Sequence, residues 1–122
     1  MENVINNMAT PLPYIDDVVP FNEKDHELMK EMKVLLAKHN ALNRFGITLL
    51  HDHFPISEEE EMVEFQDSQN QTLTAKPMSK AKLAEMPITL METQWRLDVP
   101  NVLAMATMKC VKHQGNRHEV VV

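Results

Sequence analysis

The sequence predicts an α+β fold, in which a long N-terminal helix packs on a curved antiparallel sheet of about five or six strands. Three observations support this prediction. Apolar residues recur at helical spacing over residues 23–43. After Gly46 the apolar period changes to two, which is typical of half-buried strands. The segments between the expected strands are short, and short connections favour antiparallel neighbours.

The first 21 residues are predicted to form an irregular arm, followed by a single α+β domain over residues 22–122. Pro11, Pro13 and Pro20 disfavour helical backbone at the residues that precede them. The arm has too many apolar residues for a disordered tail, namely Leu12, Tyr14, Ile15, Val18, Val19 and Phe21. We therefore expect it to pack against the domain or against a second subunit.

The long helix is expected between Glu23 and about Asn43. Asn22 is a suitable N-cap, and the acidic Glu23 and Asp25 favour the first turn because of the helix dipole. The apolar positions of the expected helix are Leu28, Met32, Leu35, Leu36, His39 and Leu42. Gly46 follows closely and suits the exit of the chain from the helix.

Six later segments are expected as strands. They are residues 47–53, 61–67, 72–76, 88–98, 102–113 and 119–122. Pro55 ends the first strand, and residues 68–71 form the turn between the second and the third. A short helix is expected within residues 77–86, with Ser79 as its cap.

Composition and charge argue against several classes of function. A net charge of −6 is unsuited to nucleic acid and to an anionic membrane surface, so neither partner is expected. Only two glycines are present, which excludes glycine-rich phosphate loops. The single cysteine excludes an intrachain disulfide, and no apolar run or leader is evident. A cytoplasmic protein is therefore expected.

Two pairs of histidines are the strongest candidate for a functional site. On a strand, His51 and His53 would project from one face, roughly 7 Å apart. His113 and His118 flank a Gly-Asn turn and would face each other across a hairpin. Four imidazoles, or three with a carboxylate, would suit zinc, iron, nickel or copper. The alternative is that these are ordinary solvated residues near strand ends.

One stretch resembles part of a known metal-binding motif. Gly46, His51, His53 and Glu58 resemble the first cupin motif, in which a glycine precedes His-x-His and a glutamate. The stretch departs from that motif where Phe65 replaces the closing glycine and in its spacing after Gly46. The resemblance implies a β-barrel in which these side chains bind a metal, together with a histidine from the C-terminal pair.

Three other features have structural as well as functional interpretations. Cys110 and His113 would need a strand bulge to meet as nucleophile and base. Cys110 is expected in the core, because it would share a strand face with Ala104, Ala106 and Met108. The ten methionines could bind Cu(I), but most occupy positions where core filling is expected. The run Glu58–Glu61 could supply an acid and a base, but a solvated loop is expected.

Three functions remain open from the sequence, and whether the chain is an enzyme is not decided. The first is a small α+β domain that acts through a protein partner or through self-association, because the arm and the C-terminal Val-Val-Val segment offer contact surfaces. The second is a metal-binding protein or cupin-like metalloenzyme that uses the histidine cluster. The third is a metal-free enzyme or small-molecule binder whose pocket contains His51 and His53.

Overall fold

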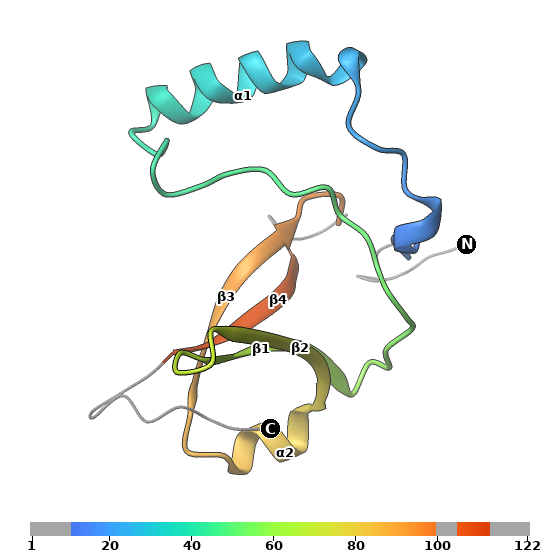
Figure 1. Ribbon diagram of the computed structural model, residues 1–122, viewed down its shortest axis with the longest axis vertical. Coiled ribbons are helices and arrows are strands. Elements are labelled where there is room, and N and C mark those ends of the chain that lie inside the picture. The colour runs from blue at the N-terminus through green and yellow to red at the C-terminus, as the bar shows by residue number, and fades with distance from the viewer. Residues whose placement is uncertain (1–10, 100–104, 113–122) are drawn as a thin grey trace. The chain divides into compact units, whose positions relative to one another are not determined.

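The computed structural model describes residues 11–99 and 105–112, and it confirms the α+β class (Figure 1). The chain divides into two compact units, which are described separately. Leu12–Phe54 is called the helix unit, and the residues from Pro55 onward are called the sheet unit. No helix in these described ranges is both long and apolar enough to cross a membrane.

The helix unit is built around α1, which spans His26–Lys38. Short 3-10 turns precede it at Ile15–Asp17 and Glu23–Asp25. The Asn22 side chain accepts a hydrogen bond from the Lys24 backbone N–H at 2.9 Å. The Asp25 carboxylate in turn accepts one from the Asn22 N–H at 3.0 Å. Asn22 therefore starts the helical region, as the sequence predicts.

The long helix predicted over residues 23–43 is shorter in the structure, because the chain leaves the helix after Lys38. Asn40 adopts a left-handed backbone with φ of 56°. Its N–H donates to the Ala37 carbonyl, and the Ala41 N–H donates to the Leu36 carbonyl at 2.7 Å. This pair of bonds is the Schellman termination, in which asparagine takes the place more often held by glycine.

The predicted strand over residues 47–53 is wrong. This segment is irregular and makes one isolated parallel bridge, between Tyr14 and Asp52. The bridge contains a bond from the Asp52 N–H to the Pro13 carbonyl and one from the Ile15 N–H to the Asp52 carbonyl. The ladder stops there because Pro13 has no N–H to donate and the chain turns at Ile15–Asp17.

The described residues of the sheet unit form four strands in the spatial order β2-β1-β4-β3 (Figure 1). Their bounds are Glu60–Asp67 for β1, Thr72–Ser79 for β2, Thr89–Arg96 for β3 and Met105–Lys112 for β4. The pairs β1–β2 and β3–β4 are antiparallel, whereas β1 and β4 are parallel. The sheet is therefore mixed, and the wholly antiparallel sheet of the prediction is wrong. A short connection determines only the relative direction of two strands that are consecutive in the chain. β1 and β4 are neighbours in the sheet but are not consecutive in the chain, so this argument does not apply to them.

Four of the six predicted strands are thus confirmed in the described part of the chain. The predicted strand 119–122 lies outside the described residues. Residues 11–99 and 105–112 contain four strands, against the five or six predicted for the whole chain. The packing of the long helix on the sheet stays a prediction, as does the division into an arm (1–21) and a domain (22–122).

The core of the sheet unit lies under α2, which spans Lys80–Glu85. Its buried members are Val63, Phe65, Met78 and Leu83, with Met86, Ile88, Leu90 and Val111 packed against them. The Ser79 hydroxyl accepts a bond from the Lys82 N–H at 3.1 Å, which confirms the predicted cap. β2 continues through Pro77, beyond its predicted end, and proline is tolerated because β2 is an edge strand of this sheet.

We expect the stability of the sheet unit to depend on Phe65, whose side chain is only 2% exposed. Phe65→Ala should lower the free energy of unfolding by about 3–5 kcal/mol, because it leaves a cavity beneath α2. Leu73→Ala, at a 66% exposed position of the same hairpin, should change it by less than about 0.5 kcal/mol. Urea denaturation of both variants checks this, and equal losses would contradict the assigned core.

Candidate functional site

The two histidines of the predicted cluster that the structure describes lie next to each other. The rings of His51 and His53 have centroids 4.9 Å apart and an interplanar angle of 83°. The His51 Nδ1 lies 2.7 Å from the Leu49 carbonyl oxygen. Both residues belong to the irregular segment that follows α1 and not to the sheet. The pair is therefore adjacent, as predicted, but for a reason other than a shared strand.

The other half of the predicted metal site, His113 and His118, lies outside the described residues. Within the ranges that the structure describes, no three His, Cys, Asp or Glu side chains are grouped so that they could hold a metal. The cupin resemblance implies a barrel, whereas the described strands form an open sheet to which His51 and His53 do not belong. The four-histidine site stays a prediction.

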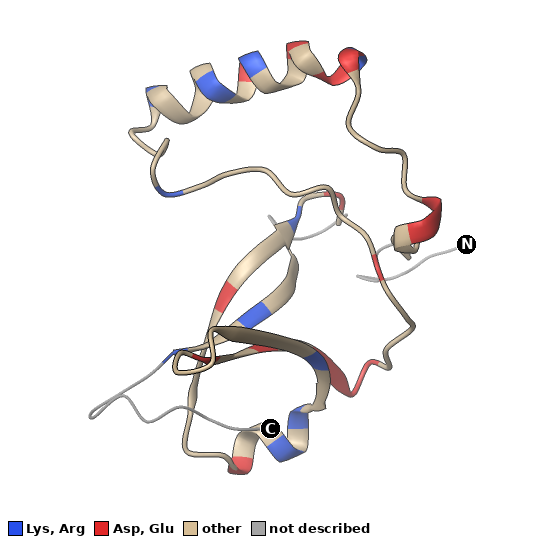
Figure 2. Cartoon of the chain, viewed as in Figure 1, with Lys and Arg blue, Asp and Glu red and all other residues tan. Residues whose placement is uncertain are grey.

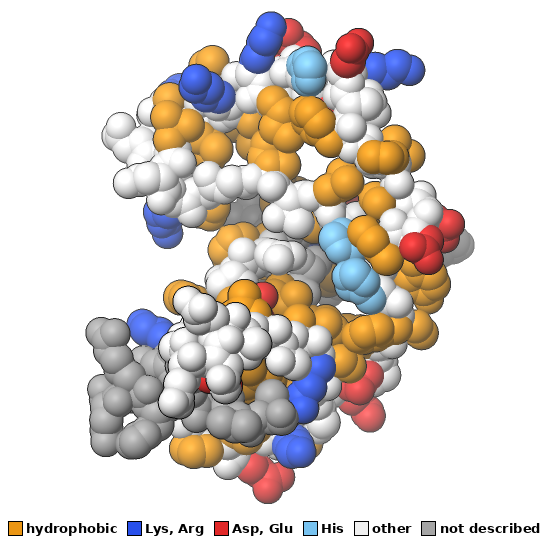
Figure 3. Space-filling model, in the orientation of Figure 1, with side chains coloured by type: hydrophobic (Ala, Val, Ile, Leu, Met, Phe, Trp, Pro, Cys, Tyr) orange, Lys and Arg blue, Asp and Glu red, His pale blue; other side chains and the backbone are white. Residues whose placement is uncertain are grey.

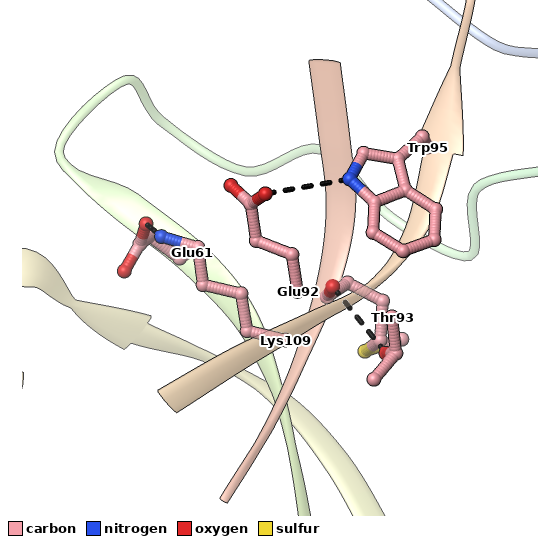
Figure 4. A network of polar contacts seen from close by, with 6 residues as sticks. Glu61, Glu92, Thr93, Trp95 and Lys109 are labelled. Atoms are coloured by element: carbon pink, nitrogen blue, oxygen red, sulfur yellow. Dashed lines mark hydrogen bonds and ion pairs between the residues drawn. The ribbon is translucent and has the colours of Figure 1, made fainter. Parts of the chain in front are cut away.

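A polar network crosses the middle of the sheet (Figure 4). The Lys109 Nζ on β4 lies 2.5 Å from a Glu61 carboxylate oxygen on β1, and both side chains are about three-quarters buried. On β3, the indole N–H of Trp95 donates to Glu92 at 3.3 Å. Glu92 and Lys109 are paired in the β3–β4 register. An ion pair therefore joins β1 to β4, and on β3 the Trp95–Glu92 bond lies beside it in the sheet register.

Cys110 belongs to the same region and is not a purely apolar core residue. Its Sγ donates to the Glu64 carboxylate at 3.1 Å and lies 3.4 Å from the Thr93 hydroxyl. Burial raises the pKa of the Cys110 thiol, and the Glu64 carboxylate raises it further, whereas the Thr93 hydrogen bond lowers it. A raised pKa disfavours the thiolate, so Cys110 is a hydrogen-bonded thiol rather than an activated nucleophile.

The sequence interpretation missed the contact between Glu64 and Cys110. It placed His113 as the candidate partner of Cys110, and His113 lies outside the described residues. Glu64 and Cys110 are 46 positions apart and meet through the parallel register of β1 and β4. No local pattern sets that register, so no signal in the sequence would have found the pair.

The helix α1 carries an apolar stripe, which is the most extensive candidate surface of the helix unit. The stripe consists of Leu28, Met29, Met32, Leu35 and Leu36. Leu28 is 53% exposed and Leu35 is 46% exposed, and no residue of α1 is buried. Figure 3 shows hydrophobic side chains gathered along one side of the helix, and Figure 2 shows its charged positions. This spacing is typical of helices that dock in apolar grooves.

The helix unit has almost no core of its own. Within Leu12–Phe54 one hydrophobic residue, Ala41, is buried. The large hydrophobic side chains that remain exposed there are Tyr14, Ile15, Val19, Phe21, Leu28, Val34, Leu35, Leu42, Phe45, Ile47, Leu49 and Phe54. Exposed apolar surface on this scale is a candidate contact surface.

The hydrogen bonds of Cys110 predict opposite effects of two substitutions on its reactivity. Glu64→Ala should lower the pKa of the thiol and speed alkylation, because it removes a carboxylate that raises the pKa. Thr93→Val should raise the pKa and slow alkylation, because it removes a bond that lowers it. The rate of reaction with iodoacetamide across the alkaline pH range measures both shifts. Glu59→Ala, which removes an exposed carboxylate before β1, is the control. Shifts of the same sign in both variants would contradict the assignment.

Comparison with protein-family models, with curated proteins and with solved structures found no match.

Proposed function

We propose that this protein acts through self-association, with the apolar stripe of α1 as its contact surface. The observation that carries the proposal is that α1 has an amphipathic sequence and yet buries none of its residues. The opposite side of the helix carries Lys30 and Val34, and Lys33 lies at the edge of the stripe, so the stripe is the more apolar surface. Leu28 and Leu35 of the stripe are exposed and the other three residues are partly exposed, and apolar surface of this kind gains free energy when it is covered.

The distribution of charge along the helix favours a second, antiparallel copy as the partner. Glu23, Asp25 and Glu27 lie at the N-terminal end, and Lys38 lies in the last turn. Antiparallel pairing sets the acidic end of one helix beside the basic end of the other. Parallel pairing would instead bring like charges together. The same charges also complement the dipole of each single helix.

The size of the stripe favours a reversible dimer over a permanent one. Full burial of a Leu or Met side chain contributes about 1.5–3 kcal/mol. Association costs about 4–15 kcal/mol in lost translational and rotational freedom. Leu28 and Leu35 are about half exposed and the other three stripe residues are less exposed, so the gain from covering each helix is a fraction of the full-burial value and is comparable with that cost. The dimer is therefore expected to dissociate on dilution.

Charged substitutions on the stripe test the proposal. The double variant Leu28→Glu/Leu35→Glu should be monomeric at concentrations where the wild-type chain dimerises, because two carboxylates would be buried at the contact. Val34→Glu is the matched control, since Val34 belongs to the same helix, is 70% exposed and lies on the opposite side. Sedimentation velocity over a concentration series measures the mass of each.

Two results would overturn the proposal. One is a wild-type chain that stays monomeric at every concentration. The other is a dimer that survives in Leu28→Glu/Leu35→Glu, whether or not it is also lost in Val34→Glu. Circular dichroism of each variant shows whether α1 is retained, so that loss of the helix is separated from loss of the contact.

A further inference from the structure

We propose that His51 and His53 chelate a single Cu(II) ion, within one chain and without His113 or His118. The proposal is independent of self-association through α1. It depends on three properties of the segment that carries the pair: the backbone is held in place, one ring nitrogen is already bonded, and the two rings are close enough to share an ion.

The backbone between the two histidines is fixed by the bridge at Asp52. Its N–H donates to the Pro13 carbonyl at 2.9 Å, and its carbonyl accepts from the Ile15 N–H at 2.8 Å. In an extended chain, residues two apart project to the same side. Because Asp52 is held in this bridge, the side chains of His51 and His53 project to the same side of the chain.

The contact of His51 with Leu49 selects the ring nitrogen that can bind a metal. A carbonyl oxygen only accepts hydrogen bonds, so the His51 Nδ1 must carry the proton and donate to Leu49 across 2.7 Å. The neutral ring then presents the lone pair of Nε2. Metal-binding histidines commonly donate their second nitrogen to a carbonyl in this way, which orients the ring and raises its basicity.

The separation of the rings matches a shared ion. A metal bound to an imidazole nitrogen at about 2.0–2.1 Å lies roughly 3 Å from the ring centre. Two rings on one ion can therefore have centres up to roughly 6 Å apart, and those of His51 and His53 are 4.9 Å apart. His53 is exposed, so its ring can turn about its side-chain bonds while His51 stays bonded to Leu49.

The ligand set favours copper over zinc. A structural zinc site takes four protein ligands, and the described residues bring no third His, Cys, Asp or Glu to this pair. Cu(II) accepts a square arrangement of nitrogen and oxygen ligands, which two imidazoles and solvent can supply. It also stands highest in the affinity order of the divalent first-row metals.

Titration of the full-length protein with Cu(II) tests the proposal, with glycine present as a competing chelator to suppress weak sites. Wild-type protein should bind one ion per chain, with two nitrogen donors in the electron paramagnetic resonance spectrum. His51→Asn/His53→Asn should lose affinity at least about tenfold, equivalent to about 1.4 kcal/mol, because it removes both imidazole ligands. Two control variants, His26→Asn/His39→Asn and His113→Asn/His118→Asn, should bind as the wild type does.

Three outcomes would overturn the proposal. Unchanged affinity in His51→Asn/His53→Asn would show that the pair is not the site. A comparable loss in His113→Asn/His118→Asn would favour a four-histidine site. One ion for every two chains would mean that the ion bridges two copies. A second measurement, of the imidazole nitrogen shifts in the metal-free protein, should find the His51 proton on Nδ1, and a proton on Nε2 would also contradict the proposal.

Discussion

The parallel pairing of β1 and β4 is the constraint on which the sheet unit depends. It aligns Val63 with Lys109 and Glu64 with Cys110, and so joins two antiparallel hairpins into one sheet. Because successive side chains alternate across a strand, the same register places Val63 in the core and Glu64 beside the Cys110 thiol. A shift of one residue would exchange these environments, since it would put a carboxylate where Val63 is fully buried.

The parts of the fold that local chemistry determines could be predicted from the sequence. The cap of α2 at Ser79 and the hairpin β1–β2 follow from residues close together in the chain. The direction and register of β4 against β1 could not be predicted, because they depend on how two hairpins meet. The strand predicted over residues 47–53 fails for a similar reason. An alternation of apolar and polar residues forms a strand only where a partner supplies a continuous ladder of hydrogen bonds, and here the pairing is a single bridge.

The candidate sites also have some features that the local sequence predicts and others that it does not. The closeness of His51 and His53 could be predicted, because residues two apart in any extended segment project to one side, with or without a sheet. The contact of His51 with Leu49 depends on the local course of an irregular chain, and periodicity says nothing about that course. Cys110 was predicted from its neighbours on β4 to be apolar core, but its environment is set by Glu64 and Thr93 on the two adjacent strands.

The two units satisfy the need to bury apolar surface in different ways. The sheet unit covers Val63 and Phe65 with its own α2, whereas within Leu12–Phe54 one hydrophobic residue, Ala41, is buried. An isolated helix shorter than about 12–15 residues is marginal in water, and α1 has 13 residues. Asn22 caps the 3-10 turn that precedes α1, and Asn40 terminates the helix, but neither covers the apolar stripe. Whatever covers that stripe therefore also stabilises the helix, so that contact formation and helix formation in this unit are expected to be coupled.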